Sequence, residues 1–140
     1  MTKVKEKVKE LIANSKTSFI SSVDQDGFPN MKAMLAPRKV KGLKEFWFST
    51  NTSSLRVSQF RKNPKASIYF YERGHIVYKG VMLTGTMEVL EDQPTKDMIW
   101  RFGDHIYYHK GKTDPDYCVL KFTATSARYY NSLHSESFKI

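Results

Sequence analysis

The chain has 140 residues, and its 23 Lys and Arg against 14 Asp and Glu leave a formal net charge of +9. This length predicts a single domain over residues 1–140, because domains commonly have about 100–200 residues. A hydrophobic content of 40% and an aromatic content of 14% exclude a chain that is disordered for want of hydrophobic residues. The single cysteine, Cys118, excludes an intramolecular disulfide framework and a cysteine-cluster metal site.

The positive charge is concentrated in the first part of the chain. Residues 1–80 carry 16 basic and 6 acidic side chains, whereas residues 81–140 carry 7 and 8. Such an excess is typical of proteins that bind nucleic acid, an anionic membrane surface or a phosphorylated small molecule. The sequence has no RNP-like, KH or zinc-finger pattern, no apolar stretch near residue 1 long enough for a signal peptide, and no apolar run long enough for a membrane span. We therefore expect a cytoplasmic protein that binds neither nucleic acid nor membrane.

The first predicted element is a short amphipathic helix over residues 2–13. Apolar residues recur along it at helical spacing, and Lys and Glu fill the other positions. The residues of the apolar face are Val4, Val8, Leu11 and Ile12. Because Glu6 and Glu10 accompany the lysines, we interpret the opposite face as solvated surface.

Six strands and two more helices are predicted after this helix. In chain order they are strands at 17–23 and 30–36 joined by a DQDG turn, a strand at 45–50, a helix at 53–62, strands at 66–72 and 76–91, a helix at 92–102, a loop at 105–116 and a strand at 117–125. We expect the long strand to be bulged at Gly80 or Gly85. This order predicts a mainly β fold with peripheral helices, in which six antiparallel strands form a small barrel.

The strand at 30–36 carries a candidate ligand-binding pair. Alternation places Lys32 and Met34 on one face, and we expect the other face to meet the core. The residues of that other face are Met31, Ala33 and Leu35. A flat aromatic ligand with an anionic tail would contact both Lys32 and Met34, although a solvated lysine on a strand edge is the commoner arrangement.

The junction FSTNTSSLR at 48–56 is the densest functional signal. A strand ends near Thr50 and a helix begins shortly afterwards, so unpaired backbone N–H groups and the positive end of the helix dipole meet there. Further donors are the hydroxyls of Thr50, Thr52, Ser53 and Ser54. Arg56 is unfavourable in the first helical turn unless an anion is bound beside it. A phosphate would satisfy all these groups; the alternative is an ordinary serine cap with a solvent-exposed Arg56.

The histidines and the cysteine do not suggest further chemistry. His105 and His109 have i, i+4 spacing, but Gly111 and the DPD segment argue against a helix there. Cys118 lies in an alternating strand, so we expect it to be buried as a small hydrophobic residue. There is no GxSxG, Walker A or GxGxxG motif. We therefore expect no metal site, and no catalytic residue can be named.

Four segments in a fixed order carry a family resemblance. They are SFISSVDQDGFPNMKAML, EFWFSTNTSSLRVSQFRKNPKASIYFYE, YKGVMLTGTMEVLED and DPDYCVLKFTATSARYYN, and they cover nearly the whole chain. The most specific piece is F-x-T-N followed by a cation near the start of a helix. In this order the sequence resembles the pyridoxamine 5'-phosphate oxidase-like split barrels that bind FMN, especially their small general-stress-protein branch. The resemblance implies an FMN-binding split barrel and a homodimer with the flavin at the subunit interface.

The resemblance also implies roles for individual residues. Those matching Lys32, Ala33 and Met34 line the flavin, those matching Ser49, Thr50 and Asn51 follow the ribityl chain and phosphate, and Arg56 takes the place of the phosphate-binding cation. These positions agree with the anion site inferred at the junction, to which the hydroxyls of Ser53 and Ser54 also belong. The expected cofactor-binding set is therefore Lys32, Ala33, Met34, Ser49, Thr50, Asn51, Ser53, Ser54 and Arg56.

Three features differ from the family pattern. The tail reads SLHSESFKI where pyridoxamine phosphate oxidases have an Arg-containing substrate signature, and Gly80 roughly replaces a family Gln. Tyr129 or Tyr130 occupies the place often held by a Trp, and one of them is expected to cover the flavin of the partner subunit. The resemblance therefore implies a flavin-dependent oxidoreductase of unknown substrate rather than an oxidase of vitamin B6 phosphates. The alternatives are a non-catalytic flavin-binding stress protein and a related barrel that holds haem or a deazaflavin.

Overall fold

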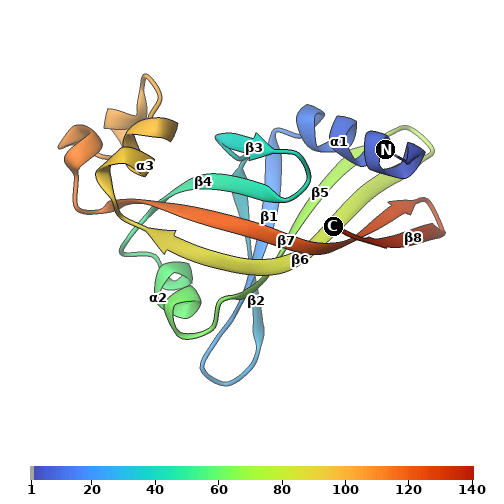
Figure 1. Ribbon diagram of the computed structural model, residues 1–140, viewed down its shortest axis with the longest axis horizontal. Coiled ribbons are helices and arrows are strands. Elements are labelled where there is room, and N and C mark those ends of the chain that lie inside the picture. Colours follow the sequence, from blue (N-terminus) through green and yellow to red (C-terminus); the bar gives the residue numbers. More distant parts are fainter. Residues whose placement is uncertain (1) are drawn as a thin grey trace.

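Alternating runs of apolar and polar residues dominate the chain, and in the computed structural model they form one antiparallel sheet flanked by helices (Figure 1). The structure describes residues 2–140. Within this range the elements are α1 (Lys3–Asn14), β1 (Thr17–Val23), β2 (Pro29–Leu35), β3 (Lys39–Lys41), β4 (Glu45–Asn51), α2 (Leu55–Lys62), β5 (Lys65–Arg73), β6 (Tyr78–Leu90), α3 (Gln93–Ile99), the short 3-10 helices η1 (Asp104–Ile106) and η2 (Gly111–Thr113), β7 (Tyr117–Asn131) and β8 (His134–Lys139). None of the helices in residues 2–140 has the length and hydrophobicity needed to span a membrane.

The strands follow the order β2-β1-β5-β6-β7-β4-β3 across the sheet, and β8 pairs with β7 outside this path. All the pairings are antiparallel. The predicted mainly β fold with peripheral helices is therefore confirmed, although residues 2–140 contain eight strands rather than six. The two additional strands are β3, which has only three residues, and β8, whose sequence HSESFK lacks a hydrophobic alternation.

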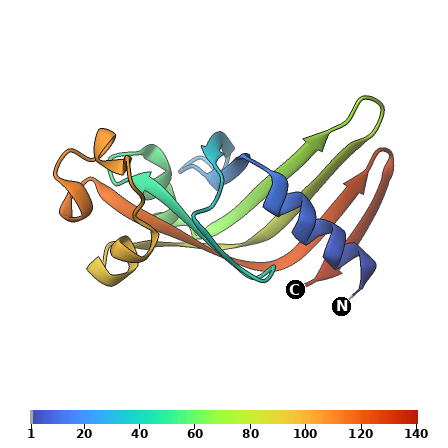
Figure 2. The ribbon, with the colours of Figure 1, turned by 90° about the horizontal axis from the view of Figure 1, so that it is seen from above.

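The main core lies where the sheet meets α1. The predicted apolar face of this helix is buried, and α1 packs against β5 and β6 (Figure 2). The largest fully buried side chains of this core include Phe46, Phe48, Phe70, Phe122, Ile20, Ile68, Leu83 and Leu120. These residues come from β1, β4, β5, β6 and β7, so the core holds the strands that reach the site described below.

The predicted irregularity of the long strand is at Gly85. The register between β6 and β7 shifts between Thr84 and Gly85. A Cβ atom at Gly85 would overlap the backbone carbonyl oxygen of Thr123, so only glycine allows β7 to approach this closely. Because bulges bend strands and increase their twist, this position helps the sheet to curl.

The orientation of β2 differs from the prediction. Lys32 pairs directly with Ile20, which is buried in the core, and Ala33 pairs with Phe19. Directly paired side chains share a face of the sheet, so the face of Lys32 and Met34 is the inner one, and Met34 packs against the core. The predicted core face of β2 is instead its outer face, on which Met31 is 73% exposed. The alternation of residues in β2 correctly predicted which side chains share a face, but it did not indicate that the more hydrophobic face is the outer one.

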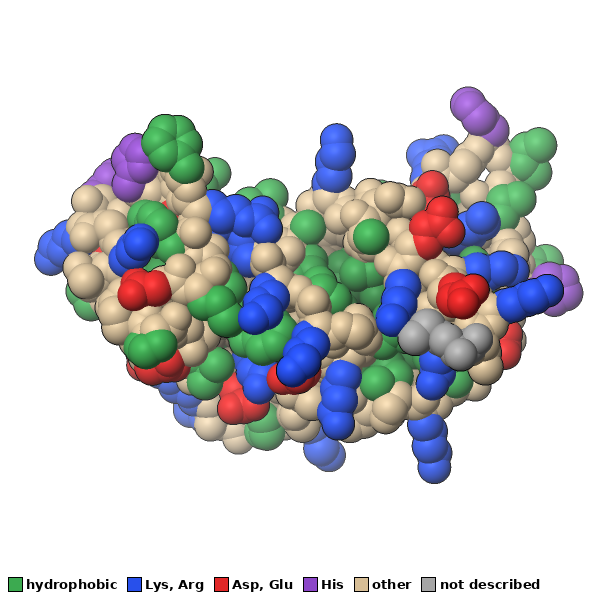
Figure 3. Space-filling model, turned by 45° about the horizontal axis from the view of Figure 1, so that its top comes forward, with side chains coloured by type: hydrophobic (Ala, Val, Ile, Leu, Met, Phe, Trp, Pro, Cys, Tyr) green, Lys and Arg blue, Asp and Glu red, His purple; other side chains and the backbone are tan. Residues whose placement is uncertain are grey.

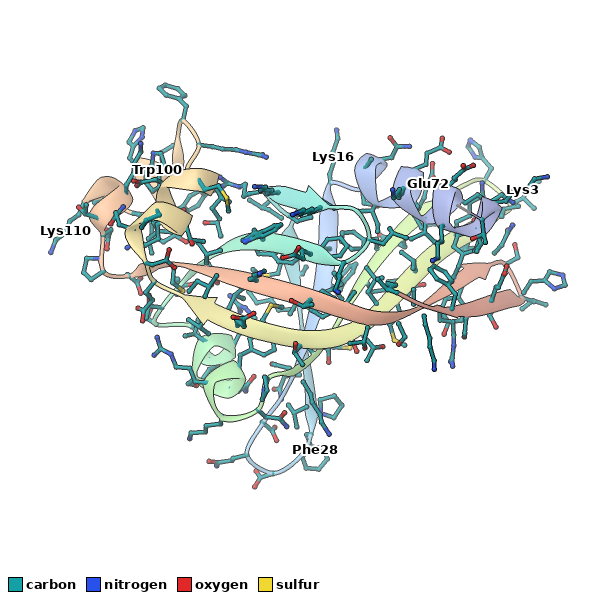
Figure 4. All side chains as sticks on the ribbon, viewed as in Figure 1. Lys3, Lys16, Phe28, Glu72, Trp100 and Lys110 are labelled. Atoms are coloured by element: carbon teal, nitrogen blue, oxygen red, sulfur yellow. The ribbon has the colours of Figure 1, made fainter. Side chains whose placement is uncertain are left out.

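Residues 91–116 form a small lobe beyond the ends of β4 and β7, drawn in gold to orange in Figure 1. Its helix α3 begins after Asp92, whose carboxylate accepts a hydrogen bond from the Thr95 amide at 3.1 Å. The predicted loop at 105–116 contains η1 and η2. The lobe packs on the sheet through an aromatic and aliphatic cluster of Trp47, Ile99, Trp100, Tyr108, Tyr117 and Val119, and Figure 4 labels Trp100 within it.

Candidate functional site

A cavity of about 190 Å³ lies where the ends of β2 and β4 meet α2 and the lobe. The strands β2 and β4 are not paired, because β2 is at one end of the sheet order and β4 is close to the other. The lining residues are Ala33, Met34, Leu35, Ala36, Arg38, Ser49, Thr50, Asn51, Arg56, Tyr107 and Tyr108. The site therefore lies between strands that are not paired with each other, where residues from distant parts of the sequence converge.

Six of the nine predicted site residues line this cavity: Ala33, Met34, Ser49, Thr50, Asn51 and Arg56. Ser54 is the N-cap residue of α2, directly beside them in the chain. Ser53 is exposed at the surface, and its hydroxyl accepts a hydrogen bond from the Asn51 side-chain amide at 2.9 Å. Lys32 is exposed on β2 and is not among the lining residues. The structure thus brings together the predicted junction and the end of β2, but it leaves Lys32 outside.

The start of α2 contains two polar atoms that are buried without a hydrogen-bond partner. They are the Oγ of Ser54 and the Nε of Arg56. Ser54 has the extended backbone of an N-cap residue, yet its hydroxyl makes no capping bond. Buried polar groups are nearly always satisfied in native proteins, and a helix N-terminus with unpaired donors attracts anions. The two atoms therefore indicate that this junction is built for an anionic group.

The loop before α2 is fixed to the beginning of β7. The amide of Thr52 donates to the backbone carbonyl of Asp116 at 2.7 Å, and the amide of Ser53 donates to the Asp116 carboxylate at 2.9 Å. Thr50 is buried, and its hydroxyl accepts a hydrogen bond from the Nη2 of Arg56 at 3.1 Å. These bonds hold the junction in place, so the unpaired groups of α2 are preorganised.

Most basic residues lie outside the site. Figure 3 shows Lys and Arg side chains scattered over one face of the molecule, separated by polar and hydrophobic ones. Two basic residues, Arg38 and Arg56, line the cavity. The electrostatics of the cavity therefore depend mainly on the surroundings of these two side chains.

The two arginines differ in their partners. Arg38 forms two hydrogen bonds with the carboxylate of Asp104, both at 2.8 Å, and this pairing raises the pKa of Arg38. No carboxylate pairs with Arg56 among the described residues, and burial lowers the pKa of its guanidinium. The charge of Arg38 is neutralised within the protein, whereas the charge of Arg56 is available to a ligand.

Five lining residues were not predicted: Leu35, Ala36, Arg38, Tyr107 and Tyr108. Tyr108 is buried, and this burial raises the pKa of its phenol, while contact with the Ser49 hydroxyl opposes the shift. The adjacent tyrosines at 107 and 108 were a signal in the sequence, because two aromatic residues are unusual in a solvated loop. Arg38 gave no such signal, since its partner lies far away in the chain.

Other residues considered for chemistry lie outside the cavity. Cys118 is buried on β7, as predicted, and burial raises the pKa of its thiol. No histidine lines the cavity, and residues 2–140 contain no cluster of three metal-ligating side chains. Of the two tail tyrosines, Tyr129 belongs to the core, whereas Tyr130 lies on the outer face beside Tyr69, with ring centroids 6.5 Å apart.

Comparisons with known proteins agree with this geometry. A solved protein from Clostridium acetobutylicum, related to general stress protein 26 of B. subtilis, is 42% identical, with 99% of this chain and 95% of that chain covered and a TM-score of 0.88. A pyridoxamine 5'-phosphate oxidase-related, FMN-binding protein from Nostoc punctiforme is 13% identical, with 100% and 97% covered and a TM-score of 0.74. A haem-binding protein from Mycobacterium smegmatis is 14% identical, with 99% and 59% covered and a TM-score of 0.80.

The two distant structures establish similarity of fold alone, which is that of the FMN-binding split barrels. A search of curated proteins finds no significant match. The family model described as pyridoxamine 5'-phosphate oxidase matches residues 4–131, which is nearly the whole chain. From this match and the 42% identical structure it follows that the chain belongs to the pyridoxamine 5'-phosphate oxidase family, in agreement with its sequence motifs.

Proposed function

We propose that this protein binds FMN and acts as a flavin-dependent oxidoreductase. The observation that carries the proposal is the pair of buried, unpartnered atoms at the start of α2, the Oγ of Ser54 and the Nε of Arg56. A phosphate group has acceptor oxygens for both, and its charge would balance the unpaired guanidinium. The junction residues therefore fit the phosphate of a mononucleotide.

The remainder of the cavity has the polarity that FMN requires. Next to Arg56, the lining is polar and comes from Ser49, Thr50 and Asn51. The opposite lining is apolar and comes from Ala33, Met34, Leu35 and Ala36. A ligand with an anionic group, a hydroxylated chain and a flat ring would match this order of surroundings. Small-molecule sites commonly combine an apolar lining with a few well-placed polar groups.

The side chains of the cavity bind and orient rather than transfer protons. Among the described residues, the lining contains no Asp, Glu or His, and its hydroxyl groups belong to Ser49, Thr50, Tyr107 and Tyr108. Bound FMN would supply hydride and electron transfer, for which the protein provides position and electrostatics. The substrate and the electron donor would be small molecules.

FMN is favoured over haem by the residues of the cavity. The solved relatives include one described as FMN-binding and one described as haem-binding. Haem iron is frequently held by a histidine, and none of the four histidines lines the cavity. By contrast, the unpaired donors of Ser54 and Arg56 at the start of α2 would bind the phosphate of FMN. The absorption spectrum of the purified protein separates a flavin, a deazaflavin and a haem.

We further propose that two copies of the chain complete the site. A cavity of about 190 Å³ is smaller than the roughly 300–1,000 Å³ typical of ligand pockets. The outer face of β2 is apolar, and the exposed apolar side chains on this face of the sheet include Met31, Leu35 and Tyr71. A homodimer would bury this face and add a second wall to the cavity. Tyr130, which lies on the outer face, is then the tail tyrosine able to cover the partner's flavin.

The proposal is tested by FMN titration of the protein freed of bound cofactor, followed by quenching of flavin fluorescence. Arg56→Glu is expected to weaken FMN binding by at least about 100-fold, because it replaces the phosphate partner with a like charge. Lys62→Glu makes the same change of charge in the last turn of α2, on an exposed side chain. This control should leave the affinity within about threefold. Wild-type protein that neither carries nor binds a flavin would disprove the proposed function.

A non-catalytic flavin-binding protein is the second candidate, and the lack of Asp, Glu and His among the described lining residues is consistent with it. Reduction of the FMN-loaded protein by NADH or NADPH separates the two. Saturable reduction would support the oxidoreductase, whereas slow reduction proportional to the nucleotide concentration would support the binding protein.

A further inference from the structure

The lobe is joined to the site by one buried ion pair. Arg38 donates to both carboxylate oxygens of Asp104 at 2.8 Å, and its Nη1 also donates to the carbonyl of Ile99 at 3.3 Å. In return, the Nη2 of Arg101 donates to the carbonyl of Arg38 at 3.0 Å. The side chains of Arg38 and Asp104 are only 10% and 6% exposed. The lobe is therefore attached to the segment that directly follows β2.

Asp104 also fixes the two tyrosines of the cavity. Its backbone carbonyl accepts hydrogen bonds from the amides of Tyr107 and Tyr108, each at 3.0 Å. Its carboxylate accepts a third bond, from the Arg101 amide at 2.8 Å, in addition to those from Arg38. One residue thus holds the ion pair with its side chain and the tyrosines with its main chain.

Tyr107 lines the cavity but is 70% exposed, whereas Tyr108 beside it is buried. One face of its ring is therefore open to a molecule that enters the site. Arg38, the other lining arginine besides Arg56, is neutralised by Asp104.

We propose that Tyr107 is a specificity-determining residue that stacks on a flat, uncharged aromatic or quinone-like substrate, and that the Arg38–Asp104 pair positions it. The inference rests on the proposed flavin site, because it assigns Arg56 to the cofactor phosphate. No unpaired cation among the described lining residues then remains for an anionic substrate. The site therefore selects neutral rings over phosphorylated or sulfonated ones.

The test uses FMN-loaded protein and two probes of similar shape, 1,4-naphthoquinone and its 2-sulfonate. Binding is followed as a saturable change in the absorption spectrum of the bound flavin, without any reductant. The neutral quinone is expected to bind at least about tenfold more tightly than the sulfonate, whose charge would lie beside Tyr107 without an unpaired cation.

Three variants distinguish the contact of Tyr107 with the substrate ring from the positioning of Tyr107 by the Arg38–Asp104 pair. Tyr107→Phe should retain binding of the neutral quinone, and Tyr107→Ala should weaken it by about three- to tenfold through loss of stacking. Asp104→Asn should lower the preference for the neutral probe, because it frees the charge of Arg38 and loosens Tyr107. Phe102→Ala, which removes a fully exposed ring of the same lobe outside the cavity lining, is the control and should change neither affinity.

The outcomes distinguish this inference from the function on which it rests. If FMN does not bind to the wild type, both are wrong. If FMN binds but the sulfonate binds as tightly as the neutral quinone, or Tyr107→Ala binds the quinone like the wild type, the inference alone is wrong. Equal losses for Tyr107→Phe and Tyr107→Ala would also contradict stacking, because the phenyl ring is present in only one of them.

Discussion

Replacing Asp104 with asparagine is expected to destabilise the protein by about 3 kcal/mol. The carboxylate accepts three hydrogen bonds at 2.8 Å, two from Arg38 and one from the Arg101 amide. Removing one partner of a buried ion pair costs about 3–5 kcal/mol, because the other charge stays buried. Asparagine keeps one acceptor oxygen, which places the loss at the lower end. For a chain of this size, about 3 °C per kcal/mol gives a fall in Tm of about 9 °C.

The loss of stability in Asp104→Asn should become smaller as the pH falls. Burial alone would raise the pKa of Asp104, but hydrogen bonds from Arg38 and the Arg101 amide hold it below its ordinary value of 3.8. A carboxylate whose pKa is lowered by folding stabilises the folded state above its unfolded pKa. The difference between wild type and Asp104→Asn should therefore be complete at pH 5–7 and should shrink as the pH falls below about 4.

Urea unfolding at several pH values measures this difference directly. Glu91→Gln is the matched control, because Glu91 forms an ion pair with Arg61 in which both side chains are about half exposed. Its effect should be at most about 1 kcal/mol. Two results would show that the Asp104 carboxylate does not hold the lobe. One is a loss of unfolding free energy in Asp104→Asn no larger than in the control at pH 7, and the other is a loss that stays the same below pH 4.

Three other changes test separate parts of the structure. Met31→Glu should convert the proposed homodimer to monomers in light scattering, because it charges the apolar outer face, whereas Leu133→Glu, on the exposed turn before β8, should leave the association unchanged. Gly85→Ala should lower the free energy of unfolding by at least about 2 kcal/mol in urea, because the new methyl group meets the Thr123 carbonyl; an unchanged midpoint would refute the close approach. The thiol of Cys118 should react with a disulfide reagent only on unfolding, because it is buried and its pKa is raised; rapid modification of the native protein would contradict this.

Features that depend on neighbouring residues could be predicted from the sequence. The helix α1 and the junction between β4 and α2 arise from the residues within or beside them, and the glycines of the long strand limited its predicted bulge to Gly80 or Gly85. The sequence also predicted that donors of Ser54 and Arg56 gather at the start of α2, but it left open whether they form an anion site or an ordinary serine cap. On β2, strand alternation indicated Lys32 and Met34, and the family resemblance added Ala33.

Features that depend on distant residues could not be predicted in this way. Arg38 and Asp104 are 66 positions apart, and neither has a distinctive local pattern. The strand β8 is polar, and the orientation of β2 followed the assumption that hydrophobic residues face inward. That assumption fails where an apolar face is exposed on the single chain, as it is around Met31.

Arg38 is paired with a carboxylate and Arg56 is not, and this difference leads to a last prediction, about the stability of an Arg56 variant. A buried donor without a partner costs about 1–3 kcal/mol, and the Nε of Arg56 is such a donor in the ligand-free chain. Arg56→Met keeps a similar length without the charge, so it should raise the free energy of unfolding of the cofactor-free protein by about 1 kcal/mol. The same variant should lose most of its FMN affinity, because the phosphate loses its cation.

The two effects have opposite signs, and only a ligand site predicts both. A structural arginine would lower stability when replaced, whereas a binding arginine is kept at a cost in stability for the sake of its ligand. Urea unfolding without FMN measures the first effect, and the rise of Tm with added FMN measures the second, since a ligand that binds only the folded state stabilises it. A cofactor-free Arg56→Met protein that is less stable than the wild type would show that Arg56 supports the fold rather than a phosphate.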